Sequence, residues 1–190
     1  MDPKRLSVIR GRVVDRDSQS PIAAGVSVSI LNHPEFGTAA TRSDGWYDIV
    51  VNGGGSYVVQ YTASGYVTAQ RSVETHWLDW SVVADVAMVA PDPTKAITLG
   101  GSTWDYVRGV PKSDVDGSRT ATVLIPPYTS IASCAGTVGC TNQAWTGGNP
   151  VQMHATEFTV GDNGPSAMPG LLPPQSGYKY AVDTGIILNG

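Results

Sequence analysis

The chain has 190 residues, of which 41% are hydrophobic and only 15% charged, and its formal net charge is −4. This length suffices for one large β domain or two small ones. The basic residues form no long run that could track a phosphate backbone, which argues against nucleic acid as a partner, and the apolar runs are too short to cross a bilayer. The 22 glycines and 13 prolines favour many turns, while the Tyr, Trp, Val and Thr content favours strands.

Strict alternation of apolar and polar residues predicts strands throughout the first half of the chain. The clearest segments are 26–30, 46–51, 57–61 and 82–89. In the last of these, Val82, Ala84, Val86 and Met88 are expected to share one face, opposite Asp85. No stretch has a capped apolar period of 3.6 residues, so we expect almost no helix. The expected core consists of Val13, Val26, Val28, Ile30, Tyr47, Ile49, Val51, Val59, Tyr61 and Val86.

The string Ala90-Pro91-Asp92-Pro93-Thr94 is typical of a domain boundary, because prolines cannot donate to a sheet and they stiffen the connection. The predicted division is 1–90 for the first domain, 91–94 for a linker and 95–190 for the second domain. Further strands are predicted at 121–125, 151–160 and 178–182. The Gly/Pro-rich segment 161–177 cannot be a central strand, and we expect it to lie packed across a surface.

Residues 8–89 carry a set of short motifs whose order and spacing are specific when taken together. They are Gly11-Arg12-Val13-Val14-Asp15, Pro21, Gly25-Val26-Ser27-Val28, Thr41-Arg42-Ser43-Asp44-Gly45-Trp46-Tyr47 and Gly65-Tyr66. This set resembles the carboxypeptidase regulatory-like, or transthyretin-like, domain. The resemblance implies a β-sandwich in which Gly25 and Gly45 permit tight turns and valines fill the core.

Two further sets of residues narrow the resemblance. The string Asn32-His33-Pro34-Glu35-Phe36-Gly37, with 42–45 and 53–55, resembles the version found in large YD-repeat proteins, which are the bacterial Rhs-type proteins and the animal teneurins. Strings between Ala155 and Tyr178 resemble the β-rich region that follows in bacterial members. The implied fold is all-β: a transthyretin-like β-sandwich followed by a second β-rich, fibronectin-like or plug-like domain with long loops. After Val182 the sequence departs from that pattern, so no function of the YD-repeat shell is transferred.

Two groups of residues are candidates for a chemical site, one of cysteines and one of aspartates. Cys134 and Cys140 share one Gly-containing loop, and their spacing can close a disulfide ring, with two free thiols as the alternative. A disulfide would indicate an oxidising compartment. Asp15, Asp17 and Asp44 could line a Ca²⁺ site on neighbouring turns, but solvated turn residues are the favoured interpretation. We expect no metal and no cofactor, because no ligand cluster with metal-site spacing is present.

Exposed apolar residues are the candidates for an interface. Trp77, Trp80 and Trp104 could stack on carbohydrate, but an apolar seam between the two domains is favoured. The triplet Ile186-Ile187-Leu188 is the most hydrophobic near either terminus. It can fold back on its own sheet, which is the favoured case, or it can complete the sheet of a neighbouring copy.

These observations predict a non-catalytic structural or interaction module of an extracellular or cell-surface assembly. The first eleven residues lack the apolar core of a signal peptide. One alternative is a self-assembling extracellular filament subunit that uses strand addition, and another is a carbohydrate- or protein-binding module. The expected partner is a protein or other copies of the chain, which would make it a homo-oligomer. An enzyme is not expected, because no nucleophile–base pair, carboxylate pair or phosphate loop is visible.

Overall fold

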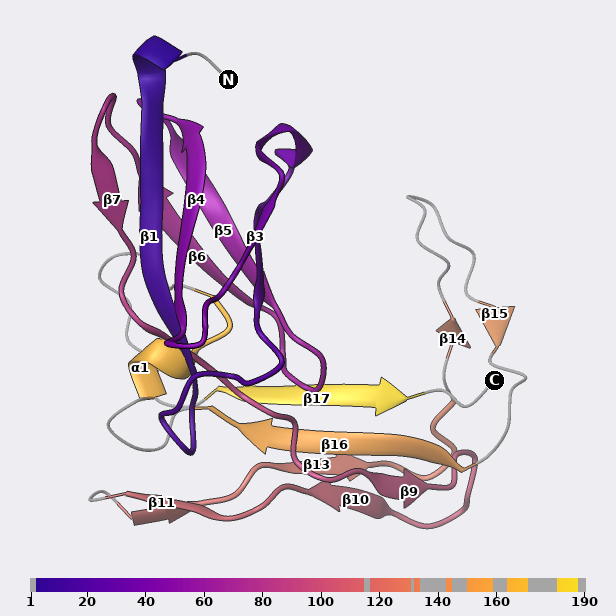
Figure 1. The fold of residues 1–190 in the computed structure, drawn as a ribbon. Coiled ribbons are helices and arrows are strands. Elements are labelled where there is room, and N and C mark those ends of the chain that lie inside the picture. Colours follow the sequence, from indigo (N-terminus) through magenta and orange to yellow (C-terminus); the bar gives the residue numbers. More distant parts are fainter. Residues whose placement is uncertain are drawn as a thin grey trace. The chain divides into compact units, whose positions relative to one another are not determined.

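The computed structural model describes residues 3–114, 117–130, 132–133, 143–144, 150–158, 164–170 and 181–187 (Figure 1). Almost all of their regular secondary structure is strand, joined by turns and irregular segments. The exceptions are one four-residue helix, α1 (Gly164–Ala167), and two 3₁₀ turns, η1 (Pro3–Arg5) and η2 (Pro34–Phe36). The all-β class and the near absence of helix are therefore confirmed for the described part. No helix there is long and apolar enough to cross a membrane.

The chain divides into two compact units. The first consists of Met1–Ala90 together with Phe158–Ala181, and the second of Pro91–Glu157 together with Val182–Gly190. The chain thus leaves the first unit once, returns to it for 24 residues, and ends in the second.

The first unit is built from two sheets (Figure 1). In one sheet, β1 (Leu6–Asp15) pairs antiparallel with β4 (Trp46–Asn52) and parallel with both β7 (Trp80–Val82) and β8 (Val86–Met88). The other sheet is antiparallel and has the order β3 (Thr38–Ala40), β2 (Ser27–Ile30), β5 (Ser56–Thr62), β6 (Ala69–Glu74). Side chains alternate across a strand, so each sheet can bury one face and expose the other.

The first unit has a single main core in which the alternating apolar residues meet. All ten residues predicted for it are buried there, which confirms the prediction. The expectation that Val82 and Ala84 share the buried face of Val86 is wrong, because Val82 is 71% exposed and Ala84 is also exposed. The reason is a break in the strand: β7 ends at Val82, β8 begins at Val86, and it is Val83 that turns into the core.

A tyrosine pair lies in this core between the two sheets. The hydroxyls of Tyr47 from β4 and Tyr61 from β5 are 2.6 Å apart, and their rings meet edge to face. Strand β1 leaves space for them at Gly11, where a Cβ would lie 2.7 Å from the Tyr47 hydroxyl. Burial raises the pKa of Tyr47 to about 12 and also raises the pKa of Tyr61.

The second unit contains smaller sheets. Its three-stranded sheet has β16 (Val151–Glu157) in the centre, antiparallel to β17 (Val182–Ile187) and to β9 (Lys95–Ile97). The remaining pairs are β10 (Asp105–Arg108) with β13 (Thr122–Ile125), β11 (Lys112–Asp114) with β12 (Gly117–Arg119), and β14 (Ala132–Ser133) with β15 (Gln143–Ala144). A core of its own includes Ile97, Val107, Ile125 and Val151.

We predict that the Tyr47–Tyr61 pair makes the first unit sensitive to alkali. Both pKa values are raised in the folded state, so the stability of the neutral pair is fully present below pH ~10 and is lost as pH rises towards ~12. The urea midpoint should fall over this range, and absorbance at 295 nm should show two of the eight tyrosines ionising only on unfolding. A Tyr61→Phe variant should show a smaller fall. If all eight tyrosines ionise together near pH 10 in the folded chain, the pair is not buried as described.

Candidate interaction surface

The acidic turn residues weighed as Ca²⁺ ligands bond to their own turns. The Asp15 carboxylate accepts the backbone N–H groups of Asp17 and Ser18 and the hydroxyl of Tyr66. Burial alone would raise the pKa of Asp15, but the hydrogen bonds from Ser18 and Tyr66 together outweigh it and the pKa is lowered. Asp44 likewise accepts the N–H of Trp46. In the described part of the chain, no group of three or more His, Cys, Asp or Glu side chains could hold a metal ion.

Four large apolar side chains are exposed within six residues of the first unit. We call them the tryptophan strip: Trp77, Leu78, Trp80 and Val82, with exposed fractions of 60%, 71%, 54% and 71%. The last two lie in β7, the end strand of its sheet. Single exposed apolar residues are ordinary on a soluble protein, whereas a contiguous set is typical of a binding surface.

The backbone around Trp77 is held by the glycine turn between β4 and β5. The N–H of Gly54 donates to the carbonyl of Thr75 at 2.7 Å, and the N–H of Thr75 donates to the carbonyl of Gly55 at 2.9 Å. A Cβ on Gly54 would overlap the Trp77 indole, so this turn needs glycine for the close approach. The guanidinium of Arg5 lies 5.2 Å from the ring centroid, within cation–π range. The indole is therefore held in place although most of it is exposed.

Leu78 has a strained backbone. Its φ is 53°, in the left-handed region that costs an L residue with a side chain about 1–2 kcal/mol. A hydrogen bond from its N–H to the Leu6 carbonyl at 2.7 Å fixes this conformation. Its exposed side chain gains little burial in return. Strain of this kind persists at sites where it serves a function, and that is the reason to regard Leu78 as part of a binding surface.

Trp80 and Val82 lie on the outer face of the sheet, beside β1. Trp80 is in register with Val8 and Val82 with Arg10. The Arg10 guanidinium lies 4.5 Å from the Trp80 ring centroid. The N–H of Trp80 donates to the carboxylate of Asp79 at 2.7 Å, so one donor on the open side of β7 is already satisfied.

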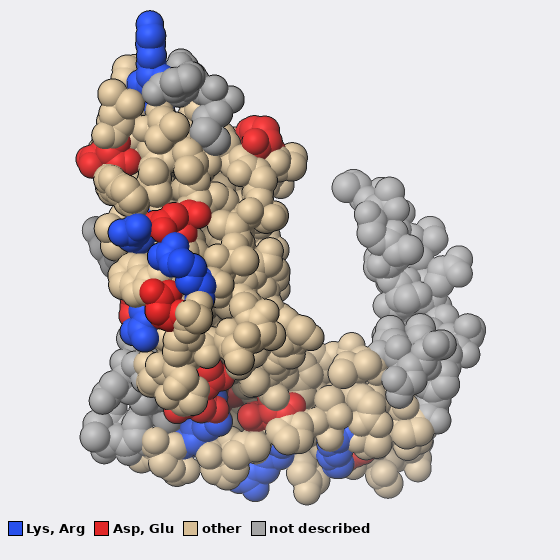
Figure 2. All heavy atoms as spheres, in the orientation of Figure 1, with Lys and Arg blue, Asp and Glu red and all other residues tan. Residues whose placement is uncertain are grey.

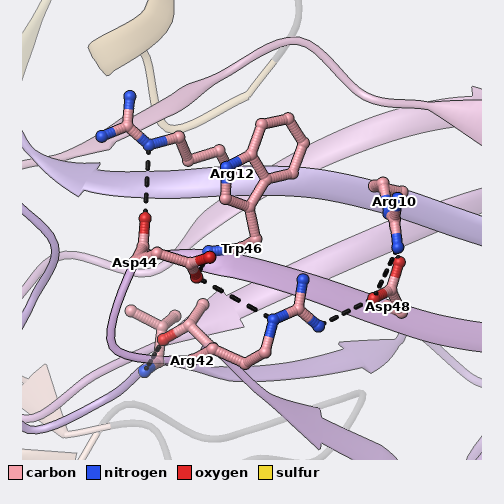
Figure 3. Close-up of polar contacts among 8 residues, drawn as sticks. Arg10, Arg12, Arg42, Asp44, Trp46 and Asp48 are labelled. Carbon is pink, nitrogen blue, oxygen red and sulfur yellow. Dashed lines mark hydrogen bonds and ion pairs between the residues drawn. The ribbon is translucent and has the colours of Figure 1, made fainter.

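An ion-pair ladder fixes Arg10 in this position (Figure 3). The Asp48 carboxylate accepts bonds from Arg10 at 2.5 and 3.1 Å and from Arg42 at 2.7 Å. Arg42 also approaches Asp44 at 3.9 Å, and Arg12 donates to the Asp44 carbonyl at 3.4 Å. The hydrogen bond from Arg10 is the main reason that the pKa of Asp48 is lowered. Figure 2 shows basic (blue) and acidic (red) side chains next to one another over the face that carries β1 and β4.

The other predicted interface residues lie in the second unit. Trp104 is 65% exposed there, whereas Trp77 and Trp80 belong to the first unit, so a seam made by all three stays a prediction. Ile186 and Ile187 lie in β17, which pairs with β16 of the same chain, with Gln152 opposite Ile187. The described part of this segment, Val182–Ile187, therefore pairs with a strand of its own chain, as in the favoured alternative. Leu188, Cys134 and Cys140 lie outside the described residues, and the disulfide stays a prediction.

Sequence reasoning found two of the four strip residues. Trp77 and Trp80 were named as interface candidates, but burial in a seam between the two domains was favoured because exposed aromatic patches are uncommon in monomers. Leu78 was missed because nothing in the string Trp77-Leu78-Asp79 signals a positive φ at a leucine. Val82 was missed because alternation assigned it to the core.

Comparison with known proteins bears on the first unit. Residues 1–88 match the family model described as "Teneurin TTR-like domain". Teneurin-3 of Mus musculus is 41% identical over 76 residues, covering 40% of this chain and 3% of that protein. Teneurin-1 of Homo sapiens is 37% identical over 94 residues, covering 48% of this chain and 3% of that protein. These matches support a transthyretin-like domain of the teneurin type in this part of the chain, as the motifs predicted.

Among solved structures, a type II Cohesin–X-Dockerin complex from Acetivibrio cellulolyticus is similar over 45% of this chain and 59% of that chain, with 22% identity and a TM-score of 0.36. A TM-score of this size carries no argument about the fold. The matched stretch spans only 3% of the teneurins named above.

We predict that Leu78→Gly stabilises the chain although it removes a large side chain. Glycine adopts the left-handed conformation without strain, and this relief should exceed its entropic cost, for a net gain of about 0.5–1 kcal/mol in the free energy of unfolding. Leu78→Ala keeps the strained φ and serves as the control, with no gain expected. Urea denaturation measures both. Equal stability of the two variants would show that the backbone is not strained at this position.

We also predict that the ladder contributes an acid-sensitive part of the stability. Because the pKa of Asp48 is lowered in the folded state, its contribution is present above pH ~4 and is lost as pH falls through the folded pKa. Asp48→Asn should remove this step, at a cost of about 1 kcal/mol or less because the pair is partly exposed. Thermal melts between pH 3 and 7 measure it. Asp85→Asn is the control. The Asp85 carboxylate lies 3.9 Å from Arg12, so this substitution should change the melting temperatures little.

Proposed function

We propose that this chain is a non-catalytic interaction module of an extracellular or cell-surface assembly, and that the tryptophan strip is its contact surface for a protein partner. The observation that carries the proposal is the exposure of Trp77, Leu78, Trp80 and Val82 on a backbone held by the glycine turn. Trp and Arg are the residues most enriched among those that dominate binding energy at interfaces. A surface that is already ordered avoids the entropy cost of ordering on binding.

The setting of the proposal comes from the relatives. The teneurin-type match of residues 1–88 supports a cell-surface context for the first unit. The strings between Ala155 and Tyr178 support the further proposal that residues 95–190 correspond to the β-rich region of YD-repeat proteins. The division into 1–90, 91–94 and 95–190 belongs to the same proposal, with a disulfide between Cys134 and Cys140.

Carbohydrate binding by the tryptophans is the second candidate. It rests on the large exposed area of both indoles, which could stack on sugar rings. Against it, a guanidinium already lies over each ring, Arg5 over Trp77 and Arg10 over Trp80. A sugar stacking on the same ring face would have to displace an arginine, and Arg10 is also bonded to Asp48. A protein partner can contact the ring edges and Leu78 without this displacement.

Cell binding by fluorescently labelled, tetramerised protein tests the proposal. We expect the wild-type chain to bind cells of a mixed panel, and binding to be lost when the cells are treated with protease but kept after glycosidase treatment. Trp80→Glu with Val82→Glu should reduce binding at least tenfold. Trp104→Glu is the matched control, because Trp104 is equally exposed in the other unit, and it should bind as the wild type does. Loss after glycosidase alone would favour the carbohydrate candidate, and equal loss in both variants would contradict a role for the strip.

A further inference from the structure

The loop between β16 and β17 is long although the two strands are joined directly at its base. Glu157 is in register with Val182, and the N–H of Phe158 donates to the Ala181 carbonyl at 3.0 Å. Strands so paired can be closed by a turn of two residues. Here the loop has 24 residues, and it belongs to the first unit rather than to the unit that holds its two strands. Its described middle part, residues 164–170, consists of α1 followed by Met168-Pro169-Gly170.

Arg71 of β6 binds the backbone of this segment. The side chain is buried, with 4% exposed, on a strand where arginine would ordinarily face water. Its guanidinium donates to the Ser166 carbonyl at 2.6 Å and to the Met168 carbonyl at 2.8 Å, as well as to its neighbour Gln70 at 2.7 Å. A guanidinium presents several donors in a rigid plane, so it can hold two carbonyls of one segment at a fixed spacing. Arg71 therefore recognises the backbone conformation of this segment rather than its side chains.

The same segment covers an open sheet edge. β6 is the end strand of the sheet β3-β2-β5-β6, and an end strand has unpaired backbone groups. The N–H of Gln70 donates to the Pro169 carbonyl at 2.7 Å. A peptide that binds by adding to a sheet edge makes bonds of this type.

The side chains of the segment are buried in an apolar cluster, whose other members would form the pocket of a peptide site. Ala167 and Met168 are each 3% exposed, and they pack with Val14, Ala87 and Val89 in a cluster separate from the main core. Phe158, at the base of the loop, is buried in the same cluster. Methionine suits such a pocket because its unbranched side chain adapts to irregular space.

We propose that the first unit has a peptide-binding site formed by Arg71, the β6 edge at Gln70 and the pocket of Val14, Ala87 and Val89. Its ligand is a short Ala-Met-Pro segment, held through its backbone carbonyls and its methionine side chain. In this chain the ligand is residues 164–170, supplied by the loop between β16 and β17. The tether keeps its effective concentration high, so the site is filled from within the chain, and a separate peptide can bind only when the loop is absent. This site is independent of the tryptophan strip.

A loop-replaced chain tests the site. Residues 159–180 are replaced by Asn-Gly, which should close the β16–β17 hairpin. A synthetic peptide of residues 159–180 should then bind this chain with 1:1 stoichiometry by isothermal titration calorimetry, and should bind the full chain at least tenfold more weakly. The same peptide with Met168→Asp, and a loop-replaced chain with Arg71→Met, should each weaken binding at least tenfold. Equal binding of the two peptides, or no binding to a folded loop-replaced chain, would overturn the proposal.

A full-length variant tests the proposed peptide site if the loop-replaced chain does not fold. In the Met168→Asp chain, hydrogen exchange of the Gln70 amide measured by NMR should accelerate at least tenfold, because its bond to Pro169 is lost. The amide of Val59, inside the main core, should exchange at its original rate. Adding the wild-type peptide should restore protection at Gln70, and the Met168→Asp peptide should not. Unchanged exchange at Gln70, or no restoration by the wild-type peptide, would contradict a peptide site.

Discussion

The hydrogen bond between the Tyr47 and Tyr61 hydroxyls connects the two sheets inside the first unit, and it depends on the missing side chain at Gly11. With Tyr47 packed against β1, the residue that follows it in β4 must face outwards, because side chains alternate along a strand. That residue is Asp48, opposite Arg10. Asp48 holds the Arg10 guanidinium, which lies over Trp80. The packing inside the sandwich thus positions the charged and aromatic groups on its outer face.

Two of the end strands in the first unit, β7 and β6, differ in how their edges are covered. At β7, the chain leaves Trp80 and Val82 exposed and satisfies one backbone donor with Asp79. At β6, the chain returns from the second unit to cover the edge with residues 164–170. An uncovered strand edge invites pairing with other chains, so covering one edge limits where a partner can add. The exposed apolar groups at β7 therefore favour that edge as the proposed contact surface.

The boundaries of the family match and of the structural unit differ. The teneurin-type model ends at residue 88, whereas the first compact unit also contains Phe158–Ala181. Phe158, Ala167 and Met168 bury the end of β1 and β8 in a cluster that residues 1–88 cannot complete alone. A fragment that stops at residue 88 would expose Val14 and Ala87 to water and would leave the Arg71 guanidinium without the carbonyls of Ser166 and Met168. Burying an arginine that has lost two of its acceptors is costly, so such a fragment should be less stable than the unit in the full chain.

The sequence by itself determined the strand class, the ten core residues and the transthyretin-like character of the first half. It could do so because alternation is a local pattern. Five or six residues suffice to predict which face of a strand is buried, and glycine and aspartate turns predict where the strand ends. Tertiary structure alone decided the rest. Val82 is exposed because β7 ends at this residue and its alternation does not continue into β8. Leu78 takes a positive φ because its N–H bonds to Leu6. Arg71 is buried because its acceptor at Met168 lies 97 residues further along the chain, a distance over which no local pattern carries information.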